Sequence, residues 1–264
     1  MPEGNELHRW AKMQTEAFGG KKVRVEGPNG RFADAVLLDG RVLREVMAVG
    51  KHIGYDFGKD RKLHVHMGLY GDFTEGTGPA PEMRGALRLR ISTKSDWLEL
   101  RGPTDCSVWT DEQWEALKAR LGPDPLNDDD PERGFQAILA KKTTSIGALL
   151  MDQTVFSGIG NIYRAEFLFR ARVSPFRAGA QMTREELKAI WKDALKLMPE
   201  GMVDRRIVTT KPPDRPHSKG PALDEEVNYV YRRKGKPCFV CGTKIEMKVM
   251  AGRNLFWCPT CQAA

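Results

Sequence analysis

Residues 238–261 read CFVCGTKIEMKVMAGRNLFWCPTC and hold two cysteine pairs, Cys238 with Cys241 and Cys258 with Cys261. Sixteen residues separate the pairs, enough for a β-hairpin that folds back and gathers four thiolates. Four sulfur ligands suit a tetrahedral zinc ion and leave no open position for a catalytic water. We therefore expect one structural Zn²⁺ that stabilises a segment too short to form its own core. A disulfide pair or an iron site is the alternative.

The surroundings of this cysteine cluster are basic. The formal net charge of the 264-residue chain is +7, and residues 231–264 carry seven lysines or arginines against one acid, Glu246. Such a surface favours a polyanionic partner such as nucleic acid, although many basic faces are merely solvated. Between the cysteine pairs, Gly252-Arg253-Asn254 is expected to form a rigid turn tip that presents Arg253 to a phosphate.

The remaining composition indicates a cytoplasmic protein. The fifth cysteine, Cys106, stands alone and is expected to be a buried free thiol, so the cysteines do not form the disulfide framework of a secreted domain. No apolar run approaches the roughly 20 residues that span a bilayer, and the N-terminal MPEGNELHRW lacks the apolar stretch of a signal peptide. We expect no membrane association.

The pattern upstream of the cysteines predicts an α+β protein. A first helix should run through Phe18 and end at Gly19-Gly20, and the chain is then strand-like to about Trp109. Many short alternating segments without long helices between them favour a β-sandwich. The expected strand segments are residues 22–27, 33–38, 41–49, 51–57, 62–70, 86–92 and 96–102.

Helices are expected in the second half of the chain. A short helix at about 110–121 precedes a segment rich in Pro, Asn and Asp, which is typical of a linker. Thr183 to Glu186 form a capping box that begins a further helix, and its apolar stripe is expected to be core. Residues 203–227, rich in Pro, Lys, Arg and Asp, are expected to form a mobile loop. The other helical segments are 135–142, 145–156 and 161–171, and the stripe comprises Leu187, Ile190, Trp191, Ala194 and Leu195.

A turn between two of these helical segments indicates a phosphate site. In residues 153–163, QTVFSGIGNIY, Gly158 and Gly160 permit close backbone approach, and Asn161 is a good N-cap for the helix that follows. The free N–H groups of a helix N-terminus favour an anion. By itself this is equally an ordinary helix-helix turn, but the basic hairpin downstream favours a second clamp on a phosphate backbone.

The N-terminal residues Met1-Pro2-Glu3-Gly4-Asn5-Glu6 suggest covalent chemistry. A small second residue permits removal of Met1, and Pro2 would then offer a secondary amine with a pKa near about 8, partly unprotonated at neutral pH. Glu3 lies beside this amine, and Glu6 lies on the same face if the segment is helical. The alternative is that Pro and two Glu residues merely begin a helix, as they often do.

These motifs together resemble the formamidopyrimidine-DNA glycosylase/endonuclease VIII family. The resemblance runs in order from MPEG through HMGLYG, RLGPDPL and DQTVFSGIGNIYRAEFLF to GRNLFWCPTCQ, and covers nearly the whole chain. It implies four segments: a catalytic β-sandwich domain with an N-terminal helix, a linker, a helix-two-turn-helix domain with the mobile loop, and a zinc-finger hairpin. Their expected ranges are 1–122, 123–134, 135–227 and 228–264.

The resemblance also implies a role for each matching residue. Pro2 matches the Schiff-base nucleophile, Glu3 the general acid and Glu6 a supporting carboxylate. Lys51, in Val-Gly-Lys-His, matches a hairpin lysine associated with β-elimination and phosphate contact. The implied activity is that of a DNA glycosylase with abasic-site lyase activity, which excises oxidised bases and then cleaves the backbone.

Further matches concern DNA binding. Asn161 matches the asparagine of the helix-two-turn-helix that binds phosphate, and Arg253 matches an arginine that grips the lesion phosphate and supports δ-elimination. Arg120 matches a DNA-contacting arginine less closely, and without the family match a solvated surface charge is its ordinary role. The implied partner is double-stranded DNA with oxidised bases or abasic sites, bound by a monomer.

Within the family, the MPEG opening and His66-Met-Gly-Leu-Tyr-Gly71 are more similar to the endonuclease VIII branch, which favours oxidised pyrimidines. Leu69 and Tyr70 then resemble the wedge that fills the gap left by an everted nucleotide; without the family match, core is the ordinary role of such a pair. Gly68 departs from the Gln of that branch, which affects recognition of the opposite base.

Three alternatives compete with this hypothesis. One is a catalytically inactive module that binds damaged DNA, which the presence of Pro2, Glu3, Lys51 and Arg253 disfavours. A second is an enzyme that prefers 8-oxoguanine or formamidopyrimidines. The third is a zinc-ribbon transcription factor, which explains the cysteines but neither the N-terminal proline nor the sandwich.

Overall fold

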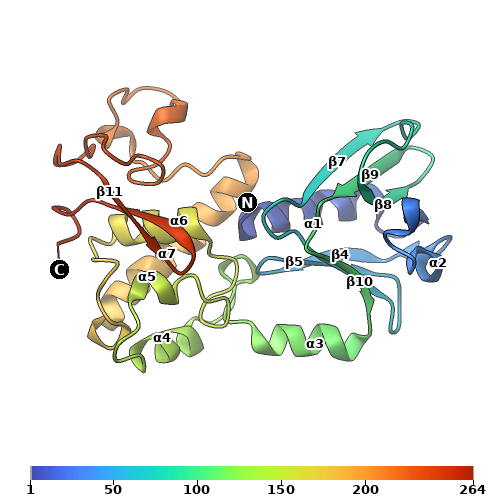
Figure 1. Cartoon of the computed structure of the whole chain (residues 1–264), viewed down its shortest axis with the longest axis horizontal. Helices are drawn as coiled ribbons and strands as arrows, with labels where there is room; N and C mark the ends of the chain where they lie inside the picture. Colours follow the sequence, from blue (N-terminus) through green and yellow to red (C-terminus); the bar gives the residue numbers. More distant parts are fainter. Residues whose placement is uncertain (1, 264) are drawn as a thin grey trace. The chain divides into compact units, whose positions relative to one another are not determined.

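The computed structural model describes residues 2–263, which fold as two compact units that meet in the chain between Arg120 and Leu121. The first unit contains two four-stranded antiparallel sheets and the N-terminal helix, and the second is mainly helical (Figure 1). The predicted α+β class, with a sandwich followed by a helical part, is therefore confirmed.

The first unit is built from two sheets and three helices. One sheet has the order β2-β8-β9-β7 and the other β10-β6-β5-β4, while β1 pairs with β3. The strands are β1 (Lys21–Lys22), β2 (Arg24–Glu26), β3 (Val42–Leu43), β4 (Glu45–Val49), β5 (His52–Asp56), β6 (Lys62–His66), β7 (Asp72–Thr77), β8 (Leu87–Ser92), β9 (Asp96–Arg101) and β10 (Asp105–Trp109). The helices are α1 (Gly4–Phe18), α2 (Ala35–Leu38) and α3 (Asp111–Arg120), with the 3₁₀ turn η1 (Pro28–Gly30).

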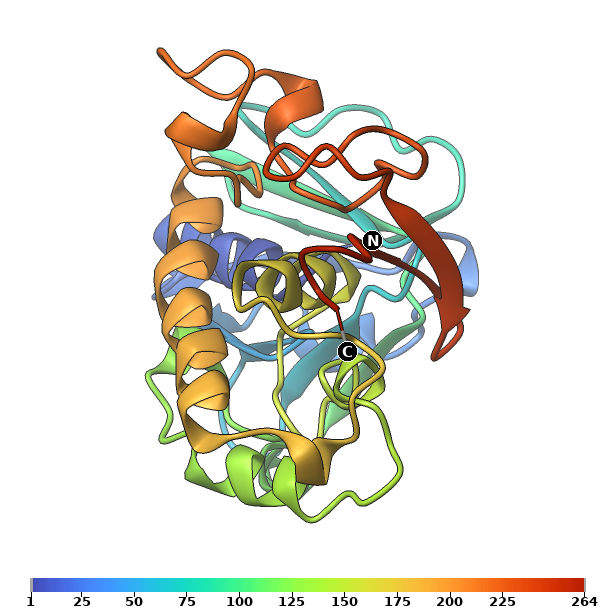
Figure 2. The same ribbon diagram turned by 90° about the vertical axis from the view of Figure 1, so that its left-hand side faces the viewer.

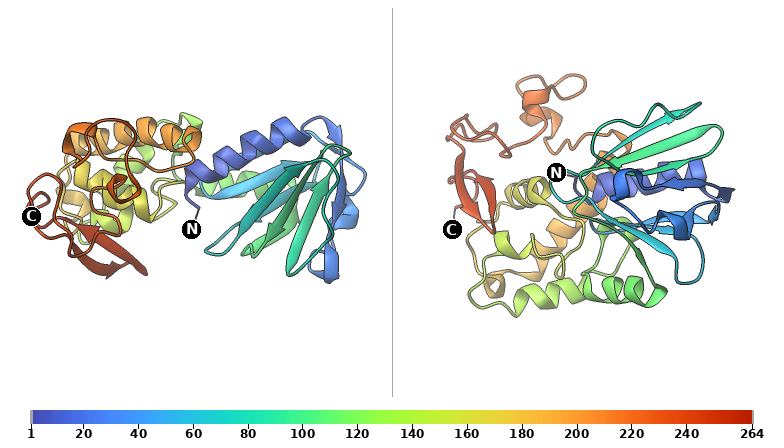
Figure 3. Two further views of the ribbon diagram at one scale, coloured as in Figure 1. Left: turned by 90° about the horizontal axis from the view of Figure 1, so that it is seen from above. Right: turned by 45° about the vertical axis from the view of Figure 1, so that its right-hand side comes forward.

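Helix α1 contacts both sheets and lies between them (Figures 1 and 3). Trp10 packs edge-on against Phe73 of β7, with ring centroids 5.1 Å apart, while the Thr15 hydroxyl bonds to the backbone of Val46 in β4. Leu7 and Phe18 are also fully buried, and each large apolar side chain removed from water contributes about 1.5–3 kcal/mol. The helix ends at Phe18, as predicted.

Two strand predictions need correction. Residues 33–38 were expected to form a strand, but Ala35–Leu38 is the short helix α2. Ala35 and Leu38 are buried while Val36 and Leu37 are exposed, so burial follows the three-residue spacing of a helix and not alternation. Conversely, β7 was not among the expected strands because its sequence, DFTEGT, has one large apolar residue.

The second unit consists of four α-helices, four 3₁₀ turns and one hairpin among the described residues. The helices are α4 (Glu132–Leu139), α5 (Ile146–Leu149), α6 (Asn161–Arg170) and α7 (Arg184–Val203). The 3₁₀ turns are η2 (Pro125–Asn127), η3 (Gly179–Gln181), η4 (Pro212–Asp214) and η5 (Asp224–Glu226), and the hairpin strands are β11 (Glu246–Met250) and β12 (Arg253–Trp257). Strand β12 packs against α6 (Figure 2).

The helices largely follow the predicted pattern. Thr183 caps α7 through a capping box with Glu186. The Thr183 hydroxyl accepts from the Glu186 N–H at 3.2 Å, and the Glu186 carboxylate accepts from the Thr183 N–H at 2.8 Å. Of the predicted apolar stripe, only Leu195 is exposed. Helix α5 is much shorter than the segment 145–156, because the chain after Leu149 turns back through bonds such as Val155 N–H to Asp152 O.

Two segments expected to be irregular are held by specific contacts. The segment 123–134 lies in the second unit, where the Asp124 side chain accepts from the Leu126 N–H at 2.9 Å. In 203–227, the buried carboxylate of Glu226 accepts from the backbone and the imidazole of His217, at 2.9 and 2.8 Å. The helices in the described part of the chain include none that is long and apolar enough to cross a membrane.

A buried carboxylate fixes the chain that leads into the cysteine segment. Glu166 of α6 is fully buried and accepts from the backbone N–H groups of Tyr229, Val230 and Tyr231, at 2.8 to 2.9 Å. Three N–H donors satisfy the oxygen atoms of this buried side chain well. The hairpin that follows is thereby tied to α6 at its base.

Candidate DNA-binding and catalytic site

Helix α1 places the N-terminal residues at one end of the first unit. The Gly20 N–H bonds to Leu43 O at 2.7 Å, and further back along the helix Thr15 bonds to Val46, so α1 runs antiparallel to β4. Its N-terminus therefore lies at the end of the sheet where β4 leads into the Gly50-Lys51 turn. Pro2 is partly exposed and Glu3 is 2% exposed. Met1, whose removal is predicted, lies outside the described residues.

Glu3 and Glu6 differ in their surroundings. Glu3 is buried at the N-cap position of α1, where its backbone carbonyl accepts from the Glu6 N–H at 2.9 Å. Glu6 is half-buried and pairs with Arg9 one turn later, with Arg9 Nε 3.0 Å from a Glu6 oxygen. That hydrogen bond raises the pKa of Arg9. Of the two carboxylates, Glu6 is thus neutralised locally by a cation.

Lys51 lies at the same end of the unit. Residues 50–51 form the tight turn between β4 and β5, and the last register pair before it joins Val49 to His52. Lys51 is partly exposed. Burial lowers the pKa of His66, the last residue of β6, and the charge of Lys51 acts in the same direction. His66 is the register partner of His52, so β6 also ends here.

Leu69 and Tyr70 lie in the turn that follows the end of β6 in the chain. They occupy the turn closed by the Gly71 N–H to Met67 O bond at 3.0 Å, and they are 46% and 84% exposed. The alternative that they are core residues is therefore wrong. Gly68, with φ of +62°, begins the turn, and a Cβ there would lie 1.8 Å from the Thr104 hydroxyl.

Arg120 ends α3 and is exposed. Its positive charge contributes to lowering the pKa of His52, so the guanidinium lies near the same end of the unit as Lys51. The structure thus gathers Pro2, Glu3, Lys51 and Arg120 at one end of the sandwich, beside the exposed Leu69-Tyr70 turn.

The four clustered cysteines form a compact sulfur site in the second unit. Their sulfur atoms all lie within 4.8 Å of one another, with Cys238 and Cys261 3.9 Å apart and Cys241 and Cys258 3.4 Å apart. Sulfurs about 2.3 Å from one central ion would stand about 3.8 Å from each other. The Val240 and Cys261 N–H groups point at sulfur atoms, at 3.5 and 3.4 Å, as thiolates require. This donor set fits zinc, and the predicted disulfide alternative is not present.

The hairpin between the cysteine pairs places Arg253 differently from the prediction. The turn consists of Ala251 and Gly252, both with positive φ, and Arg253 is the first residue of β12, paired with Met250. Two left-handed residues are the usual solution for a two-residue hairpin turn. Arg253 is partly exposed and donates to Gly252 O at 3.0 Å. It therefore lies at the base of the turn and not at its tip.

Asn161 connects this hairpin to α6. It is the first residue of α6, and Gly160 takes the N-cap position that the sequence pattern predicted for Asn161. The Asn161 amide donates to Asn254 O at 2.9 Å, across to β12. Asn161 and the hairpin that carries Arg253 are thus held together inside the second unit.

Arg164 was not predicted and reinforces this connection. It is fully buried and donates to Asn161 Oδ1, to Gly147 O at 3.1 Å and to Met250 O at 3.3 Å. One guanidinium therefore joins α5, α6 and the hairpin turn. A charged residue at the third position after Asn161, between the apolar residues Tyr163 and Ala165, was the available signal in the sequence.

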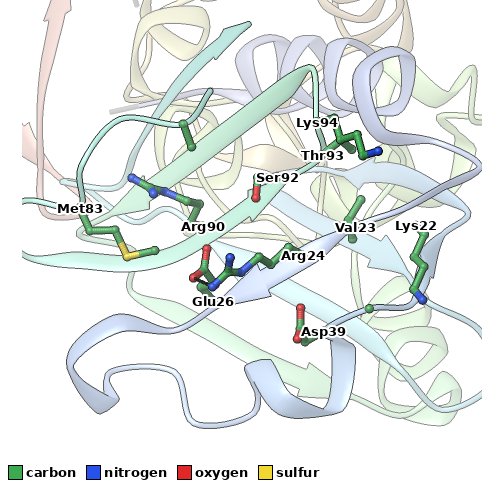
Figure 4. A pocket seen from close by; sticks show the side chains of 12 residues that line it. Lys22, Val23, Arg24, Glu26, Asp39, Met83, Arg90, Ser92, Thr93 and Lys94 are labelled. Carbon is green, nitrogen blue, oxygen red and sulfur yellow. Dashed lines mark ion pairs between the residues drawn. The ribbon is translucent and has the colours of Figure 1, made fainter. Parts of the chain in front are cut away.

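A separate cavity of about 600 Å³ lies in the first unit, at β2 and β8 (Figure 4). Arg24 and Glu26, two of its lining residues, form an ion pair at 2.8 Å. Its twelve lining residues include none of the predicted site residues, so it does not belong to the candidate site.

Comparison with known proteins agrees with this geometry. Residues 121–211 match the family model described as the formamidopyrimidine-DNA glycosylase H2TH domain, and residues 235–264 match the zinc finger found in FPG and IleRS. The chain is 44% identical to Endonuclease 8 1 of Mycobacterium tuberculosis, over 99% of this chain and 100% of that one. It is 32% identical to the formamidopyrimidine-DNA glycosylase of Thermus thermophilus, over 99% of this chain and 98% of the relative.

The fold is also similar to that of solved structures. The Lactococcus lactis Fpg, in a complex with DNA containing an abasic site, is 21% identical, covers 99% of this chain and 100% of that chain, and has a TM-score of 0.82. The chain belongs to the formamidopyrimidine-DNA glycosylase/endonuclease VIII family. Its four cysteines bind one structural zinc ion, as the sulfur geometry and the zinc-finger match both indicate.

Proposed function

We propose that the protein is a bifunctional DNA glycosylase and abasic-site lyase that excises oxidised bases, with pyrimidines favoured. The main support is the placement of the N-terminus. Helix α1 runs antiparallel to β4 and so brings Pro2 and Glu3 to the end of the first unit that also holds the Lys51 turn and the exposed Leu69-Tyr70 turn. The relatives named Endonuclease 8 1 and formamidopyrimidine-DNA glycosylase support the same class of activity.

The chemistry follows from a secondary amine at residue 2. After removal of Met1, the Pro2 nitrogen attacks C1′ of the damaged nucleotide while the bond from C1′ to the base breaks. The sugar ring then opens at the C1′–O4′ bond, and the proton of the attacking amine passes to O4′. The product is an iminium ion, which has no nitrogen proton to lose and so remains an electron sink for elimination. Glu3, adjacent and buried, protonates the departing base.

Residues of both units bind the DNA backbone in this proposal. Lys51 contacts phosphate and supports β-elimination, while Asn161 and Arg253 bind phosphate and Arg253 supports δ-elimination. The coupling of Asn161 to the hairpin through Asn254 supports a shared role for these two residues. Arg120, exposed at the end of α3, is a further DNA contact.

The exposed turn suits the role of a wedge. Leu69 and Tyr70 are the apolar and aromatic side chains that fill a gap in a base stack, and two such exposed residues in one turn have no structural reason to face water. An inactive DNA-binding module remains the competing function, and it predicts binding without covalent chemistry.

Borohydride trapping distinguishes the two functions. Reduction of the iminium should fix a covalent adduct between the protein and DNA with an abasic site or thymine glycol, and peptide mapping should locate it at Pro2. The adduct should form much more slowly in Pro2→Gly, whose primary amine gives only a neutralisable imine, and mass spectrometry should find Met1 absent from the active protein. An adduct on a lysine that persists in Pro2→Gly would overturn the mechanism, and DNA binding without any adduct would support the inactive module.

A further inference from the structure

The outer face of one sheet carries a row of histidines beside the Lys51 turn. Ile53 and Val65 point into the core, so alternation turns His52, His64 and His66 to the opposite face. Trp114 of α3 covers this face, because a Cβ at Gly54 would lie only 2.7 Å from its ring.

The histidines are connected to a carboxylate by two hydrogen bonds. Asp105 Oδ2, on the neighbouring strand β10, lies 2.6 Å from His64 Nδ1, and His64 Nε2 lies 2.9 Å from His52 Nδ1. The Ser107 hydroxyl also donates to Asp105 Oδ2, at 2.9 Å, and accepts from Trp109 Nε1 at 2.9 Å. We call Asp105, His64 and His52 the histidine relay.

The direction of the relay follows from the donors and acceptors. A carboxylate only accepts, so His64 Nδ1 carries a proton and donates to Asp105. Neutral His64 then has a lone pair on Nε2 and accepts from the protonated Nδ1 of His52. His52 is left with an unprotonated Nε2, the less common tautomer of a free imidazole.

Packing keeps these rings uncharged. His52 stacks on His66 and His64 with centroids 4.7 and 5.2 Å apart, and Trp109 stacks on His64 at 3.7 Å. Several imidazolium ions at this spacing would repel one another. Burial lowers the pKa of His52 to about 3, helped by His64, His66 and Arg120 and opposed by Asp105. Burial also lowers the pKa of His64 and His66, with Lys51 acting in the same direction on His66.

We propose that Asp105 and His64 fix His52 as a neutral hydrogen-bond acceptor, and that the relay thereby positions the Lys51 ammonium for cleavage of the abasic site. Lys51 directly precedes His52 at the turn. In this proposal, a protonated His52 would repel the ammonium, whereas the neutral ring would offer its Nε2 lone pair to one of the three N–H donors of Lys51. The three relay residues are positioning residues, and the inference rests on the proposed function for its kinetic part alone.

Nuclear magnetic resonance tests the direction of the relay without any activity. In long-range ¹H–¹⁵N correlation spectra of histidine-labelled protein at neutral pH, His52 and His64 should each have a protonated Nδ1 and an unprotonated Nε2. A cationic ring, or a protonated Nε2 on either residue, would overturn the proposal. This result is independent of whether the protein cleaves DNA.

The kinetic test uses Asp105→Ala, on an edge strand where the Asp105 side chain is 40% exposed. Loss of the acceptor should return both histidines to tautomer mixtures and slow single-turnover cleavage of a preformed abasic site by about tenfold. Asp105→Asn, which keeps the shape, should give a smaller loss. The matched control is Asp56→Ala, on the same sheet face but paired with Lys62, and it should change cleavage by less than about twofold and leave the tautomers unaltered.

The outcomes separate the two proposals. Cleavage at the wild-type rate by Asp105→Ala, with its tautomers scrambled, would refute the positioning role while leaving the glycosylase and lyase function intact. Wild-type protein that cannot cleave an abasic site would refute the lyase function, whatever the spectra show of the relay.

Discussion

Glu3 is a buried carboxylate that directly follows Pro2 in the chain, and it has no requirement to act once the base has left. Glu3→Gln keeps the shape and removes the ionisable acid. Excision of a damaged base should fall by at least about 100-fold, while cleavage of a preformed abasic site should change by only a few-fold. The two rates are measured separately in single-turnover assays.

The control for this substitution is Glu16→Gln, an exposed residue of the same helix, which should leave both rates unchanged. Equal losses of the two activities in Glu3→Gln would show that Glu3 is not specific to the glycosylase step. Such a result would assign it to the positioning of Pro2.

Position 68 requires a glycine because its backbone has a positive φ and because Thr104 leaves no room for a side chain. A side chain there is strained by φ of +62° and would meet the Thr104 hydroxyl, so Gly68→Ala should lower the free energy of unfolding by about 1–2 kcal/mol. Adding Thr104→Ala should recover part of this loss, because it removes the hydroxyl and leaves the strain in φ. Urea denaturation of the single and double variants measures both effects, and a Gly68→Ala protein as stable as the wild type would contradict the account.

Single residues were predictable where their chemistry is local. The secondary amine of Pro2, the adjacent Glu3 and the spacing of the cysteines can be read from neighbouring letters. The partnership of Asp105 with His64 could not, because it depends on the register of β10 against β6 across 41 positions of the chain. For the same reason, the contact of Arg164 with Met250 was invisible in the sequence.

At the scale of elements, the zinc-finger hairpin depends on its metal. Cys238→Ser removes one of four thiolates and should release β11 and β12, which carry Arg253, while the sandwich of the first unit stays folded. DNA binding should weaken by at least about tenfold in fluorescence anisotropy, and elemental analysis should find the zinc lost.

Cys106→Ser is the matched control, because Cys106 is a buried thiol of the first unit outside the sulfur cluster. Burial raises its pKa to about 12, so the thiol is protonated and inert at neutral pH. This variant should keep its zinc and its DNA affinity. Full DNA binding by metal-free Cys238→Ser protein would refute the role assigned to the hairpin.

The elements themselves were predicted best where periodicity is strong. The capping box of α7 and the end of α1 at Phe18 were correct, because the signals lie within one helix turn of each boundary. Residues 33–38 and α5 were not, because four-residue helices lack a full apolar repeat and are held by tertiary contacts. Gly160 displaced Asn161 from the N-cap because the asparagine side chain is used on β12.

At the scale of the whole molecule, the proposed contacts divide into two kinds. Lys51, Asn161 and Arg253 are proposed to bind phosphates, and such contacts carry no information about the base, so they would give affinity without lesion choice. Choice of lesion must then arise from the everted-base pocket, from the wedge at Leu69-Tyr70 and from the ease of unstacking. The net charge of +7 supports the first kind of contact only.

We expect oxidised pyrimidines to be the preferred lesions, because they meet the requirements of the pocket, the wedge and unstacking best. Thymine glycol has lost ring planarity and stacks poorly, so the usual cost of a few kcal/mol for extrusion of a base falls for it. Gly68 offers no side chain to the orphaned base, which should weaken discrimination among the four opposite bases. We therefore expect single-turnover excision of thymine glycol to exceed that of 8-oxoguanine by about tenfold or more, with little dependence on the opposite base.

The decisive measurement pairs thymine glycol and 8-oxoguanine with each of the four opposite bases on otherwise identical duplexes. Undamaged duplex is the control, and the Leu69→Ala variant tests the wedge, since its loss should slow excision of both lesions while abasic-site cleavage changes less. Faster excision of 8-oxoguanine opposite cytosine would overturn the pyrimidine preference. Because the phosphate contacts and the Pro2 amine are common to both lesions, that outcome would leave the proposed glycosylase and lyase chemistry untouched.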